Sequence, residues 1–269
     1  MSANIYKHEL RIRLRSVVIW STALAAMILF FFSLFPAFAD QAAVMNEMLA
    51  KFPPELAAAF NLNVVDLSSV LGFYSLVFLF VQLCLAIQAG NYGFGLVSIE
   101  ETELTADFLL TKPVSRVQVL TSKLLAALTS LTLTSLVVWV TSFIALTFLS
   151  GGRKYDLPTL LLLLVSITIF QLFFLGVGLV ISLIVKRVRS VTPYSLGLGF
   201  GMYVLAAFSG VFGDVNLELV TPFKHIDPAY IVKHSAFNSP LVLLNVAVTV
   251  VALGLSYWLY LRRDIQAVS

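Results

Sequence analysis

Six long stretches of the chain contain no Asp, Glu, Lys or Arg, and they constrain the fold more than any other feature. The stretches cover residues 17–39, 67–99, 124–152, 157–185, 190–213 and 235–261. Each exceeds the roughly 20 residues that a helix needs to cross the hydrocarbon core of a bilayer. A helix satisfies its own backbone groups in lipid, whereas the strands of a membrane barrel would alternate polar and apolar residues, which these stretches do not. The sequence therefore predicts an all-α, polytopic membrane protein with six transmembrane helices.

The composition agrees with this fold class. Of the 269 residues, 59% are hydrophobic and 12% are charged, whereas a soluble domain carries about 25% charged residues. The first stretch is also longer than the apolar region of a secretory signal, about 7–15 residues, so we expect it to be a retained span. We expect a single permease-like transmembrane domain over residues 1–269, with spans near 17–39, 68–90, 124–149, 158–185, 190–213 and 240–261.

The distribution of basic residues predicts the orientation. With the N-terminus in the cytoplasm, 12 of the 17 lysines and arginines fall on the cytoplasmic side. The positive-inside rule then places both termini in the cytoplasm. Because topology accounts for these bases, no nucleic-acid partner is expected. The basic stretch IYKHELRIRLR at residues 5–15 is either a short amphipathic helix on anionic lipid or a plain cytoplasmic flank of the first span.

Several classes of activity find no motif in the chain. It lacks GxxxxGK[ST], HExxH and GxSxG, so we expect neither ATP hydrolysis nor another enzymatic activity. The Glu100-Glu101 pair resembles the acidic pair of intramembrane prenyl-type proteases, but Thr105 stands where those proteins have arginine. His225, Asp227 and His234 match no metal-ligand spacing. The spans lack ionisable side chains for ion coupling, so the energy for any transport should come from elsewhere.

The most charged segment covers residues 98–116 and reads SIEETELTADFLLTKPVSR. Ser98 followed by Glu101 is a capping-box pattern, which predicts that a helix begins near Ile99. Acids suit the positive end of the helix dipole in the first turns. Phe108 belongs to the apolar side of this helix, so the segment is predicted to form a short amphipathic helix.

A proline and a second cap follow. Pro113 should end the short helix, and Ser115 with Gln118 forms another capping-box pattern that opens the third span. One interpretation is a linker helix that lies on the membrane surface. Since acids would avoid an anionic leaflet, the other interpretation is a helix that docks onto a soluble partner.

The segment resembles the cytoplasmic loop of permease subunits of ATP-binding cassette (ABC) transporters of the type-2 export class. In that family an acidic pair precedes a threonine, a Leu-Leu pair, a Pro-Val-Ser-Arg run and a lysine at the next span. This sequence has Glu100-Glu101, Thr105, Leu109-Leu110, Pro113 to Arg116 and Lys123. It departs from the family at Leu104, where a glycine is usual. The six spans and the KFPPELAAAFNL stretch that starts at residue 51 are also similar.

The resemblance implies a permease subunit that exports a substrate across the cytoplasmic membrane, and a prokaryotic origin. A separate cytosolic ABC ATPase subunit would bind ATP and Mg²⁺, and a second permease copy or a sister permease would complete the membrane part. Contact with the ATPase subunit would involve a coupling helix, with Glu100, Glu101, Glu103, Thr105, Asp107, Phe108, Leu109, Pro113 and Arg116. The alternative function is a membrane scaffold or sensor subunit that binds a soluble partner through the same loop.

The resemblance also implies candidate residues inside the membrane. In the family the second and fifth spans meet across the dimer, which makes Gln82, Gly197, Gly201 and Tyr203 candidates for the dimer interface or the transport pathway. Gly197 and Gly201 form a GxxxG motif, which lets two helices approach closely. That contact could equally be an internal one within a single subunit.

Overall fold

Six helices of the computed structural model are long and apolar enough to cross a membrane, which confirms the predicted fold class. The structure describes residues 2–41, 48, 51, 53, 65–102, 114–185, 188, 190–209 and 217–262. Within these ranges no strand occurs. The long helices are α1 (Ala3–Asp40), α4 (Val70–Thr102), α6 (Arg116–Phe148), α7 (Leu157–Ile184), α8 (Val191–Phe208) and α11 (Ser239–Arg262).

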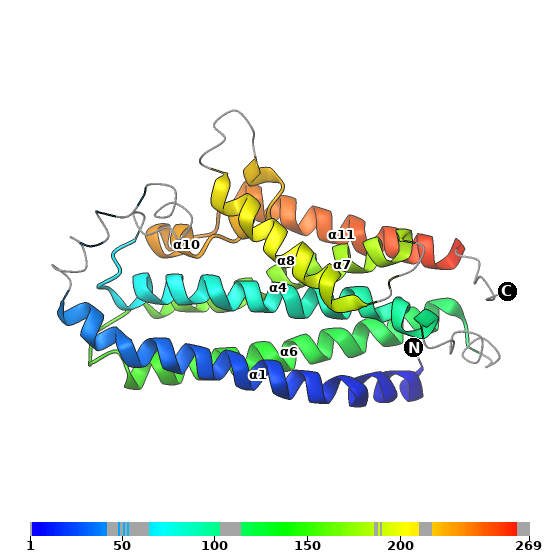
Figure 1. Ribbon diagram of the computed structural model, residues 1–269, viewed down its shortest axis with the longest axis horizontal. Coiled ribbons are helices and arrows are strands. Elements are labelled where there is room, and N and C mark those ends of the chain that lie inside the picture. Colours follow the sequence, from blue (N-terminus) through cyan, green and yellow to red (C-terminus); the bar gives the residue numbers. More distant parts are fainter. Residues whose placement is uncertain are drawn as a thin grey trace.

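The long helices form a layered bundle with α4 at its centre (Figure 1). Helix α1 lies beside α6, α4 packs along α7, and α7 packs in turn against α11. Helix α8 crosses α4 on the side away from α1. The central position of α4 explains why most of its apolar residues are buried inside the bundle, whereas α1, α8 and α11 expose theirs.

Glycines allow the close approach of α4 and α7. A Cβ atom on Gly93 would lie 2.4 Å from the carbonyl oxygen of Leu175, and one on Gly178 would lie 3.1 Å from that of Gly90. Without side chains at these positions the two backbones meet directly, as is common where membrane helices cross. This crossing fixes the middle of the bundle.

Hydrogen bonds join the ends of α1, α4, α6 and α11 at one end of the bundle, which we name the basal end. The amide of Ser2 donates a hydrogen bond of 2.8 Å to Ser122 Oγ, which joins the start of α1 to α6. Arg116 Nη1 donates a hydrogen bond of 3.4 Å to the carbonyl oxygen of Leu261, which joins the start of α6 to the end of α11. Helix α4 also ends here, since Lys123 Nζ donates to the Leu96 carbonyl oxygen over 2.7 Å.

One of the two predicted helix caps is wrong. Ser98 is buried within α4, and its hydroxyl donates to the carbonyl oxygen of Phe94, four residues earlier. A serine inside a helix can bond backward in this way, so a Ser-x-x-Glu pattern alone does not mark a helix start. Helix α4 therefore continues from the span through Glu101 to Thr102.

The other predicted cap is confirmed. The amide of Gln118 donates to Ser115 Oγ over 3.2 Å, and the amide of Ser115 donates to Gln118 Oε1 over 3.1 Å. This reciprocal capping box starts α6, eight residues before the predicted start of the third span at residue 124.

The N-terminal stretch is helical and forms the first turns of α1. It is continuous with the span and packs against α6, where the hydroxyls of Tyr6 and Thr129 lie 3.0 Å apart. The bases of this stretch do not share one environment, because Lys7, Arg11 and Arg15 are exposed while Arg13 is buried. Neither interpretation of the stretch included this packing.

A re-entrant segment connects α8 and α11, between the predicted fifth and sixth spans. It contains the short helices η1 (Leu217–Leu219), α9 (Pro222–His225) and α10 (Pro228–His234). Gln82 Nε2 donates to the carbonyl oxygen of Ile226, the cap residue of α9, over 2.9 Å. Gln82 lies 12 residues after the start of α4, about 18 Å along the helix axis, so the segment contacts α4 well inside its length. Non-helical backbone at such depth is stable when protein groups satisfy it, as Gln82 does here.

Candidate coupling site at the basal end

The predicted coupling segment begins on α4 and ends on α6. Glu100 and Glu101 lie in the last turns of α4, and Arg116 is the first residue of α6. The remaining predicted coupling residues lie outside the described residues: Glu103, Thr105, Asp107, Phe108, Leu109 and Pro113. The roles assigned to all of these residues stay predictions.

The two helix ends that carry the segment are fixed to each other and to their neighbours. Lys123 holds α6 to α4 through the Leu96 carbonyl oxygen, as described above. Five residues after the start of α6, the hydroxyls of Thr121 and Tyr257 lie 2.9 Å apart and hold α6 to α11. The two helices that flank the segment are therefore bonded to each other and to α11. We name these three bonded helix ends, of α4, α6 and α11, the frame.

Buried charges reinforce this frame, and we name Glu9, Arg13 and Lys123 the basal ion cluster. Arg13 is 9% exposed and Lys123 is 2% exposed. Arg13 Nη1 donates to Glu9 Oε2, and the other carboxylate oxygen of Glu9 lies 3.7 Å from Lys123 Nζ. The guanidinium of Arg13 also lies 5.9 Å from the centre of the Tyr92 ring on α4. Charged residues are rarely buried to this degree unless they are paired.

This cluster was not predicted from the sequence. Arg13 was expected to be a base in the cytoplasmic flank of the first span, and Lys123 to be the lysine at the start of the third span. The one available signal was the i, i+4 spacing of Glu9 and Arg13, which is typical of an ion pair on one helix face. No local pattern could indicate Lys123 as a third member, because it lies more than 100 residues further along the chain.

The predicted interface glycines lie on an open face of α8. A Cβ atom on Gly197 or on Gly201 would have no atom within 4 Å. The internal contact of α8 is made instead by Gly199, where a Cβ atom would lie 3.0 Å from Ile87 on α4. The alternative of an internal GxxxG contact therefore finds no support in the described part of the chain.

The other two candidates take part in packing within one chain. Gln82 is 1% exposed and holds the re-entrant segment. Tyr203 is half-buried and packs edge-on against Phe223 of α9, with ring centres 5.5 Å apart. The roles predicted for Gln82 and Tyr203 at an interface or in a pathway stay predictions.

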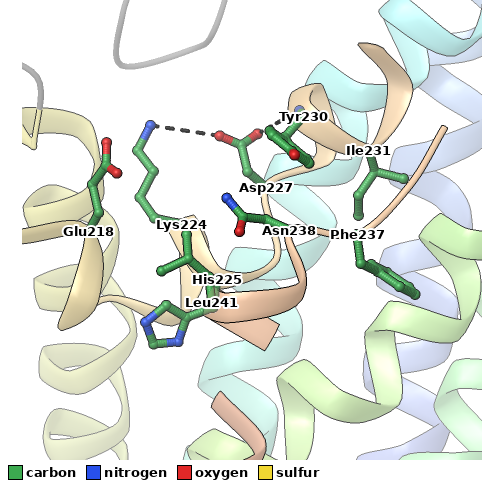
Figure 2. Close-up of a pocket in the computed structure, with 9 residues that line it drawn as sticks. All are labelled: Glu218, Lys224, His225, Asp227, Tyr230, Ile231, Phe237, Asn238 and Leu241. Carbon is green, nitrogen blue, oxygen red and sulfur yellow. Dashed lines mark hydrogen bonds and ion pairs between the residues drawn. The ribbon is translucent and has the colours of Figure 1, made fainter. Parts of the chain in front are cut away.

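A small cavity of about 120 Å³ lies in the re-entrant segment (Figure 2). Lys224 Nζ points toward Asp227 and lies 3.7 Å from its Oδ2 atom, while Oδ1 accepts from the amides of Ala229 and Tyr230 at the start of α10. Burial raises the pKa of Asp227 despite the nearby Lys224. The residues that line the cavity are Glu218, Lys224, His225, Asp227, Tyr230, Ile231, Phe237, Asn238 and Leu241.

These polar groups serve the local fold. The His225 ring points away from Asp227 in Figure 2, and its Nε2 atom lies 3.2 Å from the Leu219 carbonyl oxygen. Burial lowers the pKa of His225, which favours the neutral ring. His234 stacks on Tyr230 instead. Among the described residues, no three His, Cys, Asp or Glu side chains are grouped to hold a metal ion.

Comparison with known proteins agrees with the architecture. The profile of a family described as ABC-2 family transporter protein matches residues 3–265, nearly the whole chain. No curated protein sequence matches the chain. The family that the 98–116 segment resembles is thus confirmed by a match over nearly the whole chain. This six-helix, multi-pass membrane protein belongs to the ABC-2 transporter family as a permease.

Proposed function

We propose that this permease exports a substrate across the cytoplasmic membrane with energy from ATP that a separate cytosolic subunit hydrolyses. The basal end would face the cytoplasm, as the distribution of the 17 lysines and arginines favours. ATP and Mg²⁺ would bind to the partner subunit. The family match supports a permease, and the direction of transport rests on the resemblance to the export class.

The observation that carries this proposal is that the two helices flanking the 98–116 segment are bonded to each other. A docked element can transmit motion only if it is attached to helices that move as rigid bodies. Helices α4 and α6 are held together next to the segment by the bond between Lys123 and Leu96. Motion of the segment would therefore act on α4 and α6 together.

A second permease subunit would pack against α8. The face of α8 that contains Gly197 and Gly201 is open, and it also exposes Phe200 and Val204. Small residues flanked by apolar side chains are typical of helix contacts in membranes. This face suits either a second copy of the chain or a sister permease.

Copurification tests the proposed function. The tagged chain, extracted from its native membrane in a mild detergent, should bring down a soluble subunit that contains a GxxxxGK[ST] motif. The complex should hydrolyse ATP, whereas the separated permease should not. A soluble partner without a nucleotide site would contradict the proposal and would favour the scaffold or sensor function.

A further inference from the structure

We propose that the basal ion cluster is a positioning device that makes α1 move together with the two helices that carry the coupling segment. Glu9 and Arg13 belong to α1, and Lys123 belongs to α6. The consequence for transport rests on the proposed function above. The mechanical link itself does not, because it concerns contacts within this chain.

Lys123 is the centre of the link. Its ammonium group bonds to the Leu96 carbonyl oxygen on α4 and lies 3.7 Å from the carboxylate of Glu9 on α1. One buried side chain thus joins three helices six residues before the end of α4. At this place Lys123 links the start of α1 to α4 and α6, the two helices that flank the coupling segment.

Arg13 provides a second connection from α1 to α4. Its guanidinium lies over the Tyr92 ring, and the Tyr92 hydroxyl donates to Ser16 Oγ of α1 over 3.2 Å. Helix α1 packs along α6 far more than along α4. The contacts of Arg13 and Tyr92 therefore add a polar link between α1 and the central helix, where the two helices pack less extensively.

The charges of the cluster explain how single changes should differ. Glu9 is shared by two cations, so removal of Lys123 leaves the carboxylate paired with Arg13. Removal of the Glu9 carboxylate would instead leave two buried cations close together. Because removing one partner of a buried pair leaves a charge uncompensated, Lys123→Met, which keeps the pair of Glu9 and Arg13, should be tolerated better than Glu9→Gln, which takes the carboxylate from both cations.

The distance between α1 and α6 tests the mechanical link in the isolated permease. Spin labels at Arg11→Cys and Val117→Cys, both exposed positions at the basal end, would report it in a Cys84→Ser background. In Lys123→Met the width of the distance distribution should at least double. Lys123→Arg, which keeps the charge, and Lys7→Met, which removes an exposed base of α1, should keep the parent's width.

A neutral variant guards against loss of folding. The triple change Glu9→Gln, Arg13→Met and Lys123→Met removes every charge of the cluster, so it should insert and unfold like the parent yet show the broad distribution. A narrow distribution in both Lys123→Met and the triple variant would overturn the proposal.

The complex with the ATPase subunit tests the consequence for coupling. With ATP and vanadate, the Arg11–Val117 distance of the parent should stay constant because α1 and α6 move as one body, while that of Lys123→Met should shift. A constant distance in Lys123→Met would show that the cluster plays no part in coupling. If no ATPase subunit is recovered with the parent, the proposed function fails, and the measurement on the isolated permease still decides the mechanical link.

Discussion

Gly93 illustrates how a single position sets the packing of this bundle. A Cβ atom there would lie 2.4 Å from the Leu175 carbonyl oxygen and 3.1 Å from the Leu179 nitrogen, both backbone atoms of α7. Gly93→Ala should therefore push α4 and α7 apart and destabilise the protein by about 1–3 kcal/mol, as overpacking does. Thermal unfolding in detergent would measure the loss.

Gly254 offers a matched control for this prediction. It lies on α11, and a Cβ atom there would have no atom within 4 Å. Gly254→Ala should leave the unfolding temperature unchanged or slightly higher, because alanine favours a helix more than glycine does. Equal effects of the two changes would contradict the view that the α4–α7 crossing needs Gly93.

At the scale of single residues, motifs within one helix could be predicted from the sequence, but contacts between residues far apart in the chain could not. The Gly197 and Gly201 motif was visible because its two members lie on one helix. Gly93 and Gly178 lie on different helices, and their close contacts with Leu175 and Gly90 arise only through the fold. Lys123 likewise looked like a loop base, because its burial depends on α1 packing against α6. Partners brought together from distant parts of a chain leave no local pattern.

At the scale of one element, substitutions on the apolar side of the coupling segment should weaken its binding to the ATPase subunit the most. Phe108→Ala should weaken binding of the ATPase subunit, because an anchor residue in such a contact typically contributes about 2 kcal/mol or more. Exposed acids contribute roughly 0–1 kcal/mol each, so Glu100, Glu101 and Glu103 should be changed to Lys together to give a clear loss. Copurification after a check of membrane insertion would measure both effects.

The same substitution at the other end of α6 provides the control. Phe148 is 77% exposed and lies far from the segment, so Phe148→Ala should copurify with the ATPase subunit like the parent. Normal binding by both segment variants would mean that residues 98–116 form a passive linker.

The helices themselves could be predicted because an uncharged run of this length has few alternatives in a membrane. The ends of the helices could not be predicted, because a charged residue marks the limit of the membrane-embedded part but does not end the helix. Helix α4 continues past residue 98 into the acidic residues, and α6 begins eight residues before its span. The re-entrant segment was missed for a related reason. It contains Lys224 and Asp227, and polar residues of this kind usually indicate a solvated loop.

At the scale of the whole molecule, the orientation is a prediction that labelling can check. Lys154 is exposed in the turn between α6 and α7, and Lys7 is exposed at the basal end. In a Cys84→Ser background, Lys154→Cys should react with a membrane-impermeant maleimide in intact cells, whereas Lys7→Cys should react only after permeabilisation. The reverse pattern would place the basal end outside the cell.

We expect the pairing of two permease subunits to depend on the open face of α8. Bulk at Gly197 and Gly201 should not disturb the single chain, because no atom lies within 4 Å of a Cβ atom at either position. The double change Gly197→Ile and Gly201→Ile should therefore insert normally but abolish pairing, since β-branched side chains keep the backbones of two helices apart. Native mass spectrometry of the purified complex would count permease subunits, identical or sister.

The control for this last prediction lies on α11, where Gly254 is as open as the two α8 glycines. Gly254→Ile adds the same side chain to another exposed helix face, so pairing should persist if α8 alone forms the interface. Pairing in the double variant would move the interface away from α8, and loss of pairing in Gly254→Ile would extend it to α11. Because all three positions lack neighbours within 4 Å, a change in pairing would report on the second subunit instead of on the fold of the first.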